Sequence, residues 1–479
     1  MSILAAFMVP HPPLIVPQVG RGGEKQIADT VRAYEQTADE IAALQPETVI
    51  ISSPHAVMYS DYFHISPGAR ANGSFSQFGA PEVSFQETYD EELVKTIAEL
   101  AAQDSFPAGT MGERDRRLDH GTMVPLYFIR KKYQDFRLVR IGLSGLPLAD
   151  HYRLGQIVQE AVEKTGRRTV FVASGDLSHK LQKYGPYGFA PEGPEYDARI
   201  MDVCGRGAFG ELFDFEETFC ERAAECGHRS FCIMAGALDG VQIEAKQLSH
   251  EDVTGVGYGI CTFYPSAGAN GAPGAASGTG ECTDPQRADR HFLARYLKRA
   301  QQEAESERAG QDEYVALARA SLEAFVRNRS RIDIPEWVPE EMRSRKAGVF
   351  VSIHKHDRLR GCIGTILPTA SCIAKEIIGN AISASTRDPR FDPIKPAELP
   401  YLSVSVDVLG EPERIESMDQ LDVKRYGVIV SCGARRGLLL PDLDGVDTVE
   451  QQVAIAMRKG GISKGEKITL ERFEVIRHH

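Results

Sequence analysis

The sequence predicts two folded parts of different class: an α/β domain with a mainly parallel central sheet flanked by helices, and then an α+β domain. In the first part, short apolar runs alternate with stretches of helical periodicity, which is the pattern of helices packed on a parallel sheet. A stretch of small residues then divides the chain, and the apolar runs beyond it follow a less regular order. With 479 residues, the chain is longer than one hydrophobic core usually serves.

Four runs rich in β-branched and other apolar residues are predicted strands of the first domain: residues 3–9, 48–52, 137–143 and 168–173. Helices are predicted between them. Residues 24–44 place apolar side chains close to the 3.6-residue period of an amphipathic helix, and residues 91–101 do the same.

The boundary between the domains is predicted from composition. Residues 266–280 contain only small side chains, asparagine and proline, without a charge or a large apolar group. Such a segment buries too little surface to become ordered, so we predict a Gly/Ala/Ser-rich flexible linker over residues 266–284. The predicted domains are residues 1–265 and 285–479.

In the second domain, residues 287–327 are predicted to form two helices interrupted near Gly310. Strand and helix signals then mix without regular alternation, which favours an α+β fold. The predicted strands are 347–353, 401–409 and 427–431, and the predicted helices are 371–386 and 448–459.

Composition and charge exclude several classes of function. The net charge is −12, from 55 basic and 67 acidic side chains, which argues against nucleic acid or an anionic membrane as the main partner. No apolar stretch approaches the ~20 residues that span a bilayer, and we expect no signal peptide. The 9 cysteines form no CxxC pair. We therefore expect a cytoplasmic protein with reduced thiols.

Three histidines follow predicted strands of the first domain: His11, His55 and His179. Ligands of open α/β sheets gather outside the carboxyl ends of the strands, so these imidazoles are expected at one crevice. Prolines flank His11 and precede His55, and they stiffen both turns. Neutral imidazole is the commonest metal ligand in proteins, and two rigidly held rings favour a metal site. The alternative is a pair of strand-end turns whose histidines face solvent.

Two further groups are candidates for acid/base chemistry. Asp176 precedes His179 by three residues, so its carboxylate could orient the imidazole or share a proton with it. The alternative is that Asp176 caps a helix beginning at Leu177. His120 follows Asp119, a predicted helix cap, and is expected near the same crevice.

The anionic metal ligand is expected late in the domain, where Glu225 and Cys226 precede an apolar run. Two histidines and a carboxylate from Glu225 would suit non-haem Fe(II). Two histidines and a thiolate from Cys226 would suit zinc or copper better. The spacing leaves both choices open.

In the second domain, two arginines, a thiol and a carboxylate mark a candidate pocket: Arg360, Cys362, Arg387 and Asp388. Arginine can bind a carboxylate or phosphate through two hydrogen bonds, and the adjacent glycines permit close backbone approach. The alternative is a tight turn with a buried cysteine.

Four motifs together resemble the class III extradiol ring-cleavage dioxygenases, which include LigB-type enzymes and Memo proteins, over about residues 1–264. The motifs are His11-Pro-Pro, Ser-Pro-His55, Leu-Asp-His120-Gly-Thr-Met-Val-Pro-Leu and Ser-Gly-Asp-Leu-Ser-His179. The resemblance implies that His11 and His55 bind iron, that His179 is the acid/base, and that His120 contacts substrate. LigB-type members add a glutamate and Memo-like members a cysteine before glycine, and Glu225-Cys226-Gly227 satisfies either pattern.

Residues 285–479 resemble the AMMECR domain, on motifs that include Leu359-Arg-Gly-Cys-Ile-Gly-Thr365 and Asp388-Pro-Arg-Phe391. The fusion resembles the AmmeMemoRadiSam system, which implies a radical-SAM protein as a partner. The expected function is Fe(II)-dependent ring cleavage of a catechol-type aromatic substrate. The alternatives are a Memo-like protein that binds copper, iron or zinc without dioxygenase activity, or a metal-dependent hydrolase. The sequence leaves the oligomeric state open, and a homo-oligomer is one of the alternatives.

Overall fold

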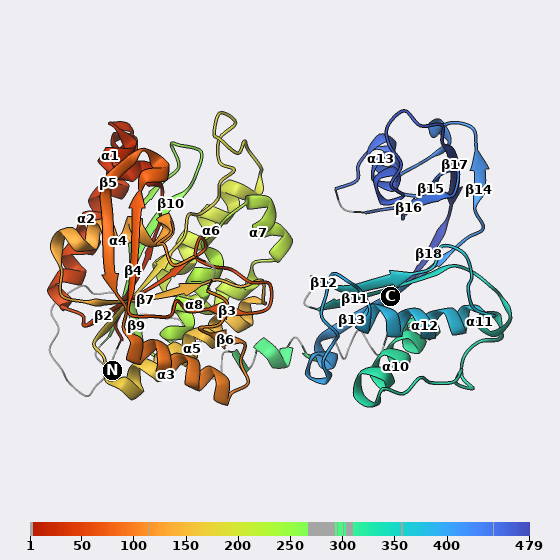
Figure 1. The fold of residues 1–479 in the computed structure, drawn as a ribbon, viewed down its shortest axis with the longest axis horizontal. Coiled ribbons are helices and arrows are strands. Elements are labelled where there is room, and N and C mark those ends of the chain that lie inside the picture. Colours follow the sequence, from red (N-terminus) through yellow and green to blue (C-terminus); the bar gives the residue numbers. More distant parts are fainter. Residues whose placement is uncertain are drawn as a thin grey trace. The chain divides into compact units, whose positions relative to one another are not determined.

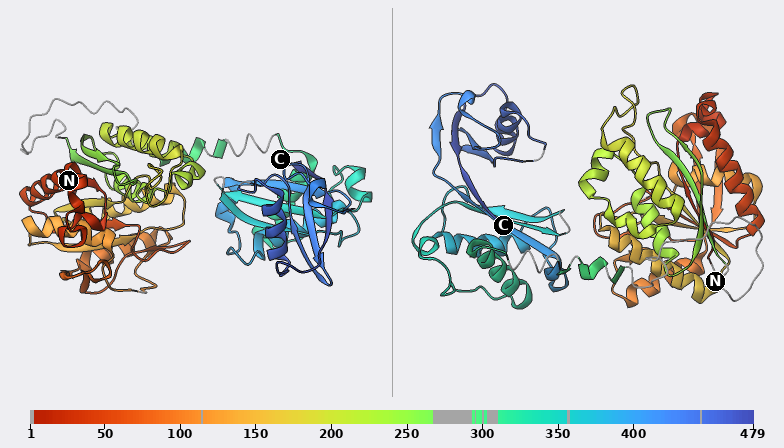
Figure 2. Two further views of the ribbon diagram at one scale, coloured as in Figure 1. Left: turned by 90° about the horizontal axis from the view of Figure 1, so that it is seen from above. Right: turned by 180° about the vertical axis from the view of Figure 1, so that it is seen from behind.

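The computed structural model describes residues 3–113, 115–266, 293–294, 296–299, 301–302, 310–355, 358–443 and 445–479. The chain divides into two compact units, Met1–Ala294 and Arg295–His479 (Figures 1 and 2). The predicted linker at 266–284 lies outside the described residues, apart from Ser266, as does the beginning of the helical segment predicted from residue 287.

A six-stranded sheet forms the centre of the first unit, in the order β7-β2-β8-β1-β10-β9. The first four strands in this order are parallel, whereas β10 and β9 add an antiparallel edge. The prediction of a mainly parallel sheet is confirmed. The strands are β7 (Arg137–Gly142), β2 (Thr48–Ser53), β8 (Thr169–Ser174), β1 (Ile3–Val9), β10 (Tyr258–Pro265) and β9 (Ile243–Glu251).

Helices cover both faces of this sheet (Figure 1). Helices α2 (Ala28–Leu44) and α4 (His120–Lys132) pack together on one face, and α8 (His228–Ala237) and α6 (Glu192–Arg206) lie on the other, with α5 (Leu148–Thr165) packed on α8. The alternating inward side chains of β1 join the α2 side chains in one apolar core. The strands therefore read as continuous apolar runs because both of their faces are covered.

A two-stranded ribbon and several further elements complete the first unit. The antiparallel strands β4 (Arg70–Phe75) and β5 (Ala80–Thr88) form a two-stranded ribbon, joined by the 3-10 turn η3 (Ser76–Phe78). The remaining elements are η1 (Pro13–Ile15), α1 (Pro17–Gly20), η2 (Gly23–Ile27), β3 (Phe63–His64), α3 (Glu91–Gln103), β6 (Ala108–Gly109), η4 (Phe209–Asp214) and α7 (Glu217–Ala223).

The second unit contains two antiparallel four-stranded sheets, β12-β11-β13-β18 and β14-β17-β15-β16, so the predicted α+β fold is confirmed. Helices α10 and α12 pack beside the first sheet and α13 beside the second. The strands are β11 (Val349–Lys355), β12 (Arg358–Gly364), β13 (Leu402–Leu409), β14 (Glu413–Ile415), β15 (Gly427–Cys432), β16 (Arg435–Leu439), β17 (Thr469–Phe473) and β18 (Val475–His478). The helices are α10 (Glu313–Asn328), α11 (Glu340–Ser344), α12 (Ile373–Thr386), η5 (Pro396–Tyr401), η6 (Met418–Gln420) and α13 (Val449–Lys459).

Within the described residues, the length and hydropathy of every helix fall short of what a membrane crossing requires.

Candidate metal centre

Three neighbouring parallel strands end at the same edge of the sheet, and a histidine follows each of them. His55 comes after β2, His179 after β8 and His11 after β1, and these strands are adjacent in the order β2-β8-β1. The sequence-based expectation that the three imidazoles share one crevice is met in their placement. His11 is buried, His179 is half-buried and His55 is exposed.

Ser174 fixes His11 in a single tautomer. The Ser174 hydroxyl lies 2.6 Å from the Gly121 carbonyl oxygen, which can only accept, so the hydroxyl proton is donated there. The same hydroxyl oxygen lies 3.0 Å from His11 Nδ1 and must therefore accept a hydrogen bond from Nδ1–H. In the neutral ring this leaves Nε2 unprotonated, with its lone pair available to a metal ion. Burial and the neighbouring His55 hold the pKa of His11 well below its usual value, so the ring is neutral at pH 7.

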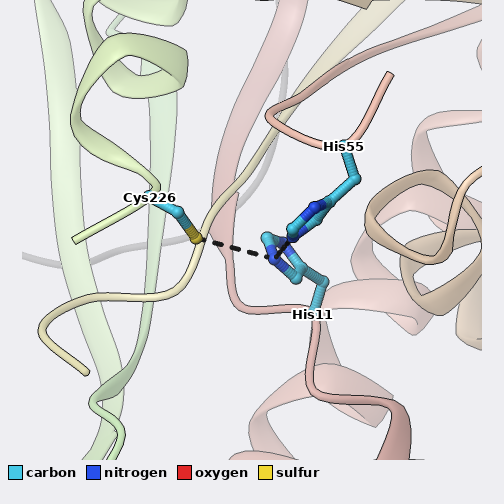
Figure 3. Close-up of side chains that lie close together, drawn as sticks. All are labelled: His11, His55 and Cys226. Atoms are coloured by element: carbon cyan, nitrogen blue, oxygen red, sulfur yellow. Dashed lines mark hydrogen bonds between the residues drawn. The ribbon is translucent and has the colours of Figure 1, made fainter. Parts of the chain in front are cut away.

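Two imidazole nitrogens and one thiol converge at this point (Figure 3). His55 Nε2 lies 3.0 Å from His11 Nε2, and Cys226 Sγ lies 3.6 Å from His11 Nε2. All three ligand atoms lie within 4.8 Å of one another. Nitrogen and sulfur ligands held tetrahedrally about 2.0–2.3 Å from an ion are about 3.3–3.6 Å apart. The donor set and its spacing therefore fit a metal ion.

Cys226 reaches the site because two glycines let their loops touch. A Cβ atom at Gly175 would lie 2.1 Å from Gly227 Cα, so no larger residue fits there without movement. The close approach lets the Asp176 backbone N–H donate a hydrogen bond to Cys226 Sγ at 3.3 Å. Burial, Asp176 and Glu225 raise the pKa of the Cys226 thiol well above its usual value. The thiol is thus protonated in the metal-free site and loses its proton on coordination.

Glu225, the predicted anionic ligand for iron, is bonded to the N-terminus of α8. Its carboxylate accepts a hydrogen bond of 2.6 Å from the backbone N–H of His228, at the N-terminus of α8. Ala224, just before it, has the left-handed conformation with φ 54°. With the Glu225 carboxylate bonded to the beginning of α8, the group beside the two imidazoles contains the alternative residue, Cys226.

Asp176 and His179 lie together in the loop after β8. Asp176 Oδ1 accepts a hydrogen bond of 2.7 Å from the His11 backbone N–H, and Oδ2 lies 3.9 Å from Nε2 of both His11 and His179. The alternative prediction, a helix beginning at Leu177 with Asp176 as its cap, is wrong. Segment 175–180 is irregular because the Leu177 N–H bonds to the Gly257 carbonyl and the Asp176 carboxylate is taken up by the His11 loop.

The histidine at the beginning of α4 completes the cluster of rings. Asp119 is the cap of this helix, as predicted, and accepts a hydrogen bond of 3.0 Å from the Thr122 N–H. The His120 ring centre lies 4.0 Å from that of His55 and 5.4 Å from that of His11. Burial and the two neighbouring imidazoles lower the pKa of His120 to about 3. His120 is therefore an uncharged polar group at neutral pH.

A cavity of about 880 Å³ opens on the His55 and His120 side of the cluster. Its other walls include the β4–β5 ribbon, the side of Phe78 and the loop that precedes α4. Phe78 meets His120 edge to face, with ring centres 5.4 Å apart. This volume lies within the range of small-molecule sites.

Several residues that shape the site are not among those predicted from the sequence. Arg140 is 1% exposed in β7 and donates hydrogen bonds of 2.7 Å to the Ser66 hydroxyl and the Arg117 carbonyl oxygen, which fix the loop before Asp119. Tyr187 stacks on His179, with ring centres 5.0 Å apart. An arginine inside an apolar strand was a usable signal for the first. No pattern in the sequence marks the stacking of Tyr187.

The candidate residues of the second unit are only partly brought together. The Cys362 backbone N–H donates to Asp388 Oδ2 at 2.9 Å, and Arg390 also pairs with that carboxylate. Arg360 instead binds Glu398, with Nε 3.0 Å from Oε1, and Arg387 is exposed at the end of α12. A shared pocket of these residues stays a prediction.

The fold and the cluster first define the class of protein. It is an α/β protein in which two parallel strands and the loop before α8 bring two imidazoles and a thiol together, in the arrangement of a metal site. The family follows from comparison with known proteins. The family model described as the catalytic LigB subunit of aromatic ring-opening dioxygenase matches residues 5–261, and the AMMECR1 family model matches residues 315–478. The chain belongs to the LigB dioxygenase family through its first unit, fused to an AMMECR1 domain.

The similar proteins match different shares of the chain. A protein of Clostridium acetobutylicum is 41% identical over 487 residues, covering 100% of this chain and 99% of its own. A Thermotoga maritima protein is 50% identical over 171 residues, covering 35% of this chain and 98% of its own. A crystal structure of a Pyrococcus horikoshii protein matches with 32% identity and a TM-score of 0.33, over 34% of this chain and 88% of that one.

Proposed function

We propose that the first unit is a metal-dependent enzyme of the extradiol dioxygenase type, acting on a catechol-like aromatic substrate. The observation that carries this proposal is the convergence of His11 Nε2, His55 Nε2 and Cys226 Sγ within 4.8 Å, at the strand ends of a LigB-type fold. These three residues would hold the metal, with Fe(II) as the first choice. Bound Fe(II) would supply a place for both catechol oxygens and for dioxygen.

The groups around the ligands are suited to moving protons. Burial lowers the pKa of His179 despite the opposing effect of Asp176, so the imidazole is neutral at pH 7 and can accept a proton from a substrate hydroxyl. Its Nε2 is buried and makes no hydrogen bond with another described residue. Asp176 Oδ2, at 3.9 Å, is close enough to stabilise the imidazolium that results. Neutral His120 can hydrogen-bond a substrate oxygen from the other side of His55.

The cavity supports an aromatic substrate of moderate size. Its 880 Å³ exceeds what a catechol ring alone needs, and Phe78 stands edge-on to His120 where such a ring would lie. His55 and His120 both line it, so a molecule in the cavity contacts the proposed metal ligand His55 directly.

A second function is favoured by the thiol. Two imidazoles and a thiolate suit zinc or copper better than iron. In that case the same cluster would serve a Memo-like metal-binding protein without dioxygenase activity, or a hydrolase in which His179 activates a metal-bound water. A radical-SAM partner for either form is likewise a proposal.

The test is reconstitution of the metal-free full-length chain with Fe(II), Zn(II) or Cu(I) under anaerobic conditions. Each form is then mixed with oxygenated buffer and a panel of catechols. Oxygen uptake matched by ring-opened product, with Fe(II) only, supports the dioxygenase. Tight retention of zinc or copper, with no oxygen uptake in the iron form, contradicts it and supports the second function. His179→Ala, loaded with the same metal, is the control for the chemical step.

A further inference from the structure

The β4–β5 ribbon presents one continuous polar face to the cavity. Three cross-strand pairs lie along this face in the order Ser74–Ser84, Asn72–Gln86 and Arg70–Thr88. Alternate residues of the ribbon, such as Ala71, Phe75 and Phe85, point the other way and join the apolar core. The polar face is therefore free to contact a ligand, because the opposite face anchors the ribbon.

The chemistry of this face changes along its length. The serine and the amide pairs line the 880 Å³ cavity that contains His55 and His120. The amide pair and the arginine pair line a second cavity, of about 320 Å³, which also contains Arg116. Asn72 and Gln86 belong to both, so the two cavities meet on the ribbon. The Ser74–Ser84 pair and the Arg70–Thr88 pair are four positions apart along the strands, which is roughly 13 Å.

The two cavities differ in whether their charged side chains are paired with each other. Near the histidines, the acidic and basic groups are already paired: Asp115 holds Arg117 through Oδ2 and Nη2 at 2.7 Å, and Arg140 lies 3.7 Å from Asp119. In the distal cavity, Glu87 is turned to the core face and binds Arg130. Arg70 and Arg116 are both exposed, and the guanidinium of neither is linked by a hydrogen bond or an ion pair to another residue among those described. Two uncompensated guanidinium groups thus remain at the distal end.

We infer that the substrate is elongated, with an aromatic head at His55 and His120, a neutral hydrogen-bonding middle on Asn72 and Gln86, and a terminal anion, carboxylate or phosphate, bound by Arg70 and Arg116. This inference rests on the proposed function for the identity of the head. The neutral amide and hydroxyl pairs would form hydrogen bonds with an uncharged middle part of the substrate. The guanidinium groups of Arg70 and Arg116 would together select the terminal anion.

The test compares two probes that differ only at the tail: N-succinyldopamine, which ends in a carboxylate, and its terminal primary amide. Binding to the metal-free full-length protein is measured by calorimetry, so the result does not depend on catalysis. We expect the carboxylate probe to bind about tenfold more tightly than the amide at low salt. This preference should fall as salt is added. A third probe of the same length that ends in a phosphate ester shows which anion is preferred.

The variants are Arg70→Gln, Arg116→Gln and their combination. The control is Arg32→Gln, which changes the charge by as much as each single variant, because exposed Arg32 pairs with Asp29 on α2. The double variant should bind both probes equally, and Arg32→Gln should behave as wild type. No tail preference in wild type, no binding of the carboxylate probe, or the same loss in Arg32→Gln would overturn the inference. A preference for the carboxylate probe, together with no ring cleavage by the Fe(II)-loaded protein, would contradict the proposed function but not the inference about the tail of the substrate.

Discussion

His11 Nδ1 lies 3.0 Å from the Ser174 hydroxyl, whose proton is committed to the Gly121 carbonyl oxygen, and this contact holds the metal-facing nitrogen of His11 unprotonated. The contact joins two adjacent strands, because His11 follows β1 and Ser174 ends β8. The geometry of the proposed metal site is thus set by the register of the sheet.

Ser174→Ala should lower metal affinity by about 10- to 100-fold, because loss of the partner frees the His11 ring to rotate and to change tautomer. The measurement is competition with a fluorescent zinc chelator. Ser321→Ala is the matched control, since this buried serine also donates to a carbonyl oxygen, that of Ile378, but lies in the second unit. Equal affinities of Ser174→Ala and wild type would show that Ser174 has no role in orienting the ligand.

His179→Ala should retain the metal and lose turnover by about 10²- to 10⁴-fold, because the imidazole is proposed to move a proton and not to coordinate. Metal content and the rate of ring opening are measured on the same preparation. A variant that loses its metal would reassign His179 as a ligand, and this outcome has a structural basis in the second possible ligand group, Asp176, His179 and Cys226.

Gly175→Ala should disturb the site without touching a ligand. The added Cβ would lie 2.1 Å from Gly227 Cα, so the loop that carries Cys226 must move away from Asp176. We expect weaker metal binding and a free energy of unfolding lower by about 1–3 kcal/mol. Gly379→Ala, in the interior of α12, should instead leave metal binding unchanged, because the added Cβ would make only an ordinary contact of 3.8 Å with Arg331 Nη2. Unchanged metal affinity in Gly175→Ala would contradict this account of how Cys226 is placed.

The second unit should lose stability at acid pH through Asp388. Hydrogen bonds from Arg390, together with that from the Cys362 N–H, lower the pKa of Asp388 to about 2 against the effect of burial. The carboxylate therefore stabilises the fold fully above its unfolded pKa of 3.8, and this stabilisation is lost as the pH falls toward 2. Asp388→Asn should be less stable than wild type at pH 6, and the difference should shrink at pH 2.5. Urea unfolding of the full chain at both pH values is the measurement, and a difference independent of pH would contradict the assignment.

The sequence was informative wherever local pattern decides structure. Apolar runs ending in a proline-stiffened histidine located β1, β2 and the turns that follow them. Asp119 was recognisable as a helix cap because capping is a local interaction. The alternative of a helix beginning at Leu177 was wrong because the Asp176 carboxylate, which could cap a helix, instead accepts a hydrogen bond from the His11 N–H after another strand. That competition is tertiary and leaves no trace in spacing.

The choice between Glu225 and Cys226 shows the same limit. The two residues are adjacent in the sequence. Which side chain faces the histidines depends on two tertiary contacts: the close approach of Gly175 to Gly227, and the hydrogen bond of Glu225 to the beginning of α8. The antiparallel edge of β10 and β9 and the β4–β5 ribbon also escaped prediction, because strand pairing over long sequence separations depends on the assembled sheet.

The central claim is that His11, His55 and Cys226 hold the metal, and metal content by mass spectrometry tests it most directly. Wild type, His11→Ala, Cys226→Ala and Glu225→Gln are purified without oxygen and loaded with equal metal. We predict about one equivalent in wild type and in Glu225→Gln, and little in His11→Ala and Cys226→Ala. Retention in Cys226→Ala together with loss in Glu225→Gln would contradict the claim and restore the carboxylate as the third ligand.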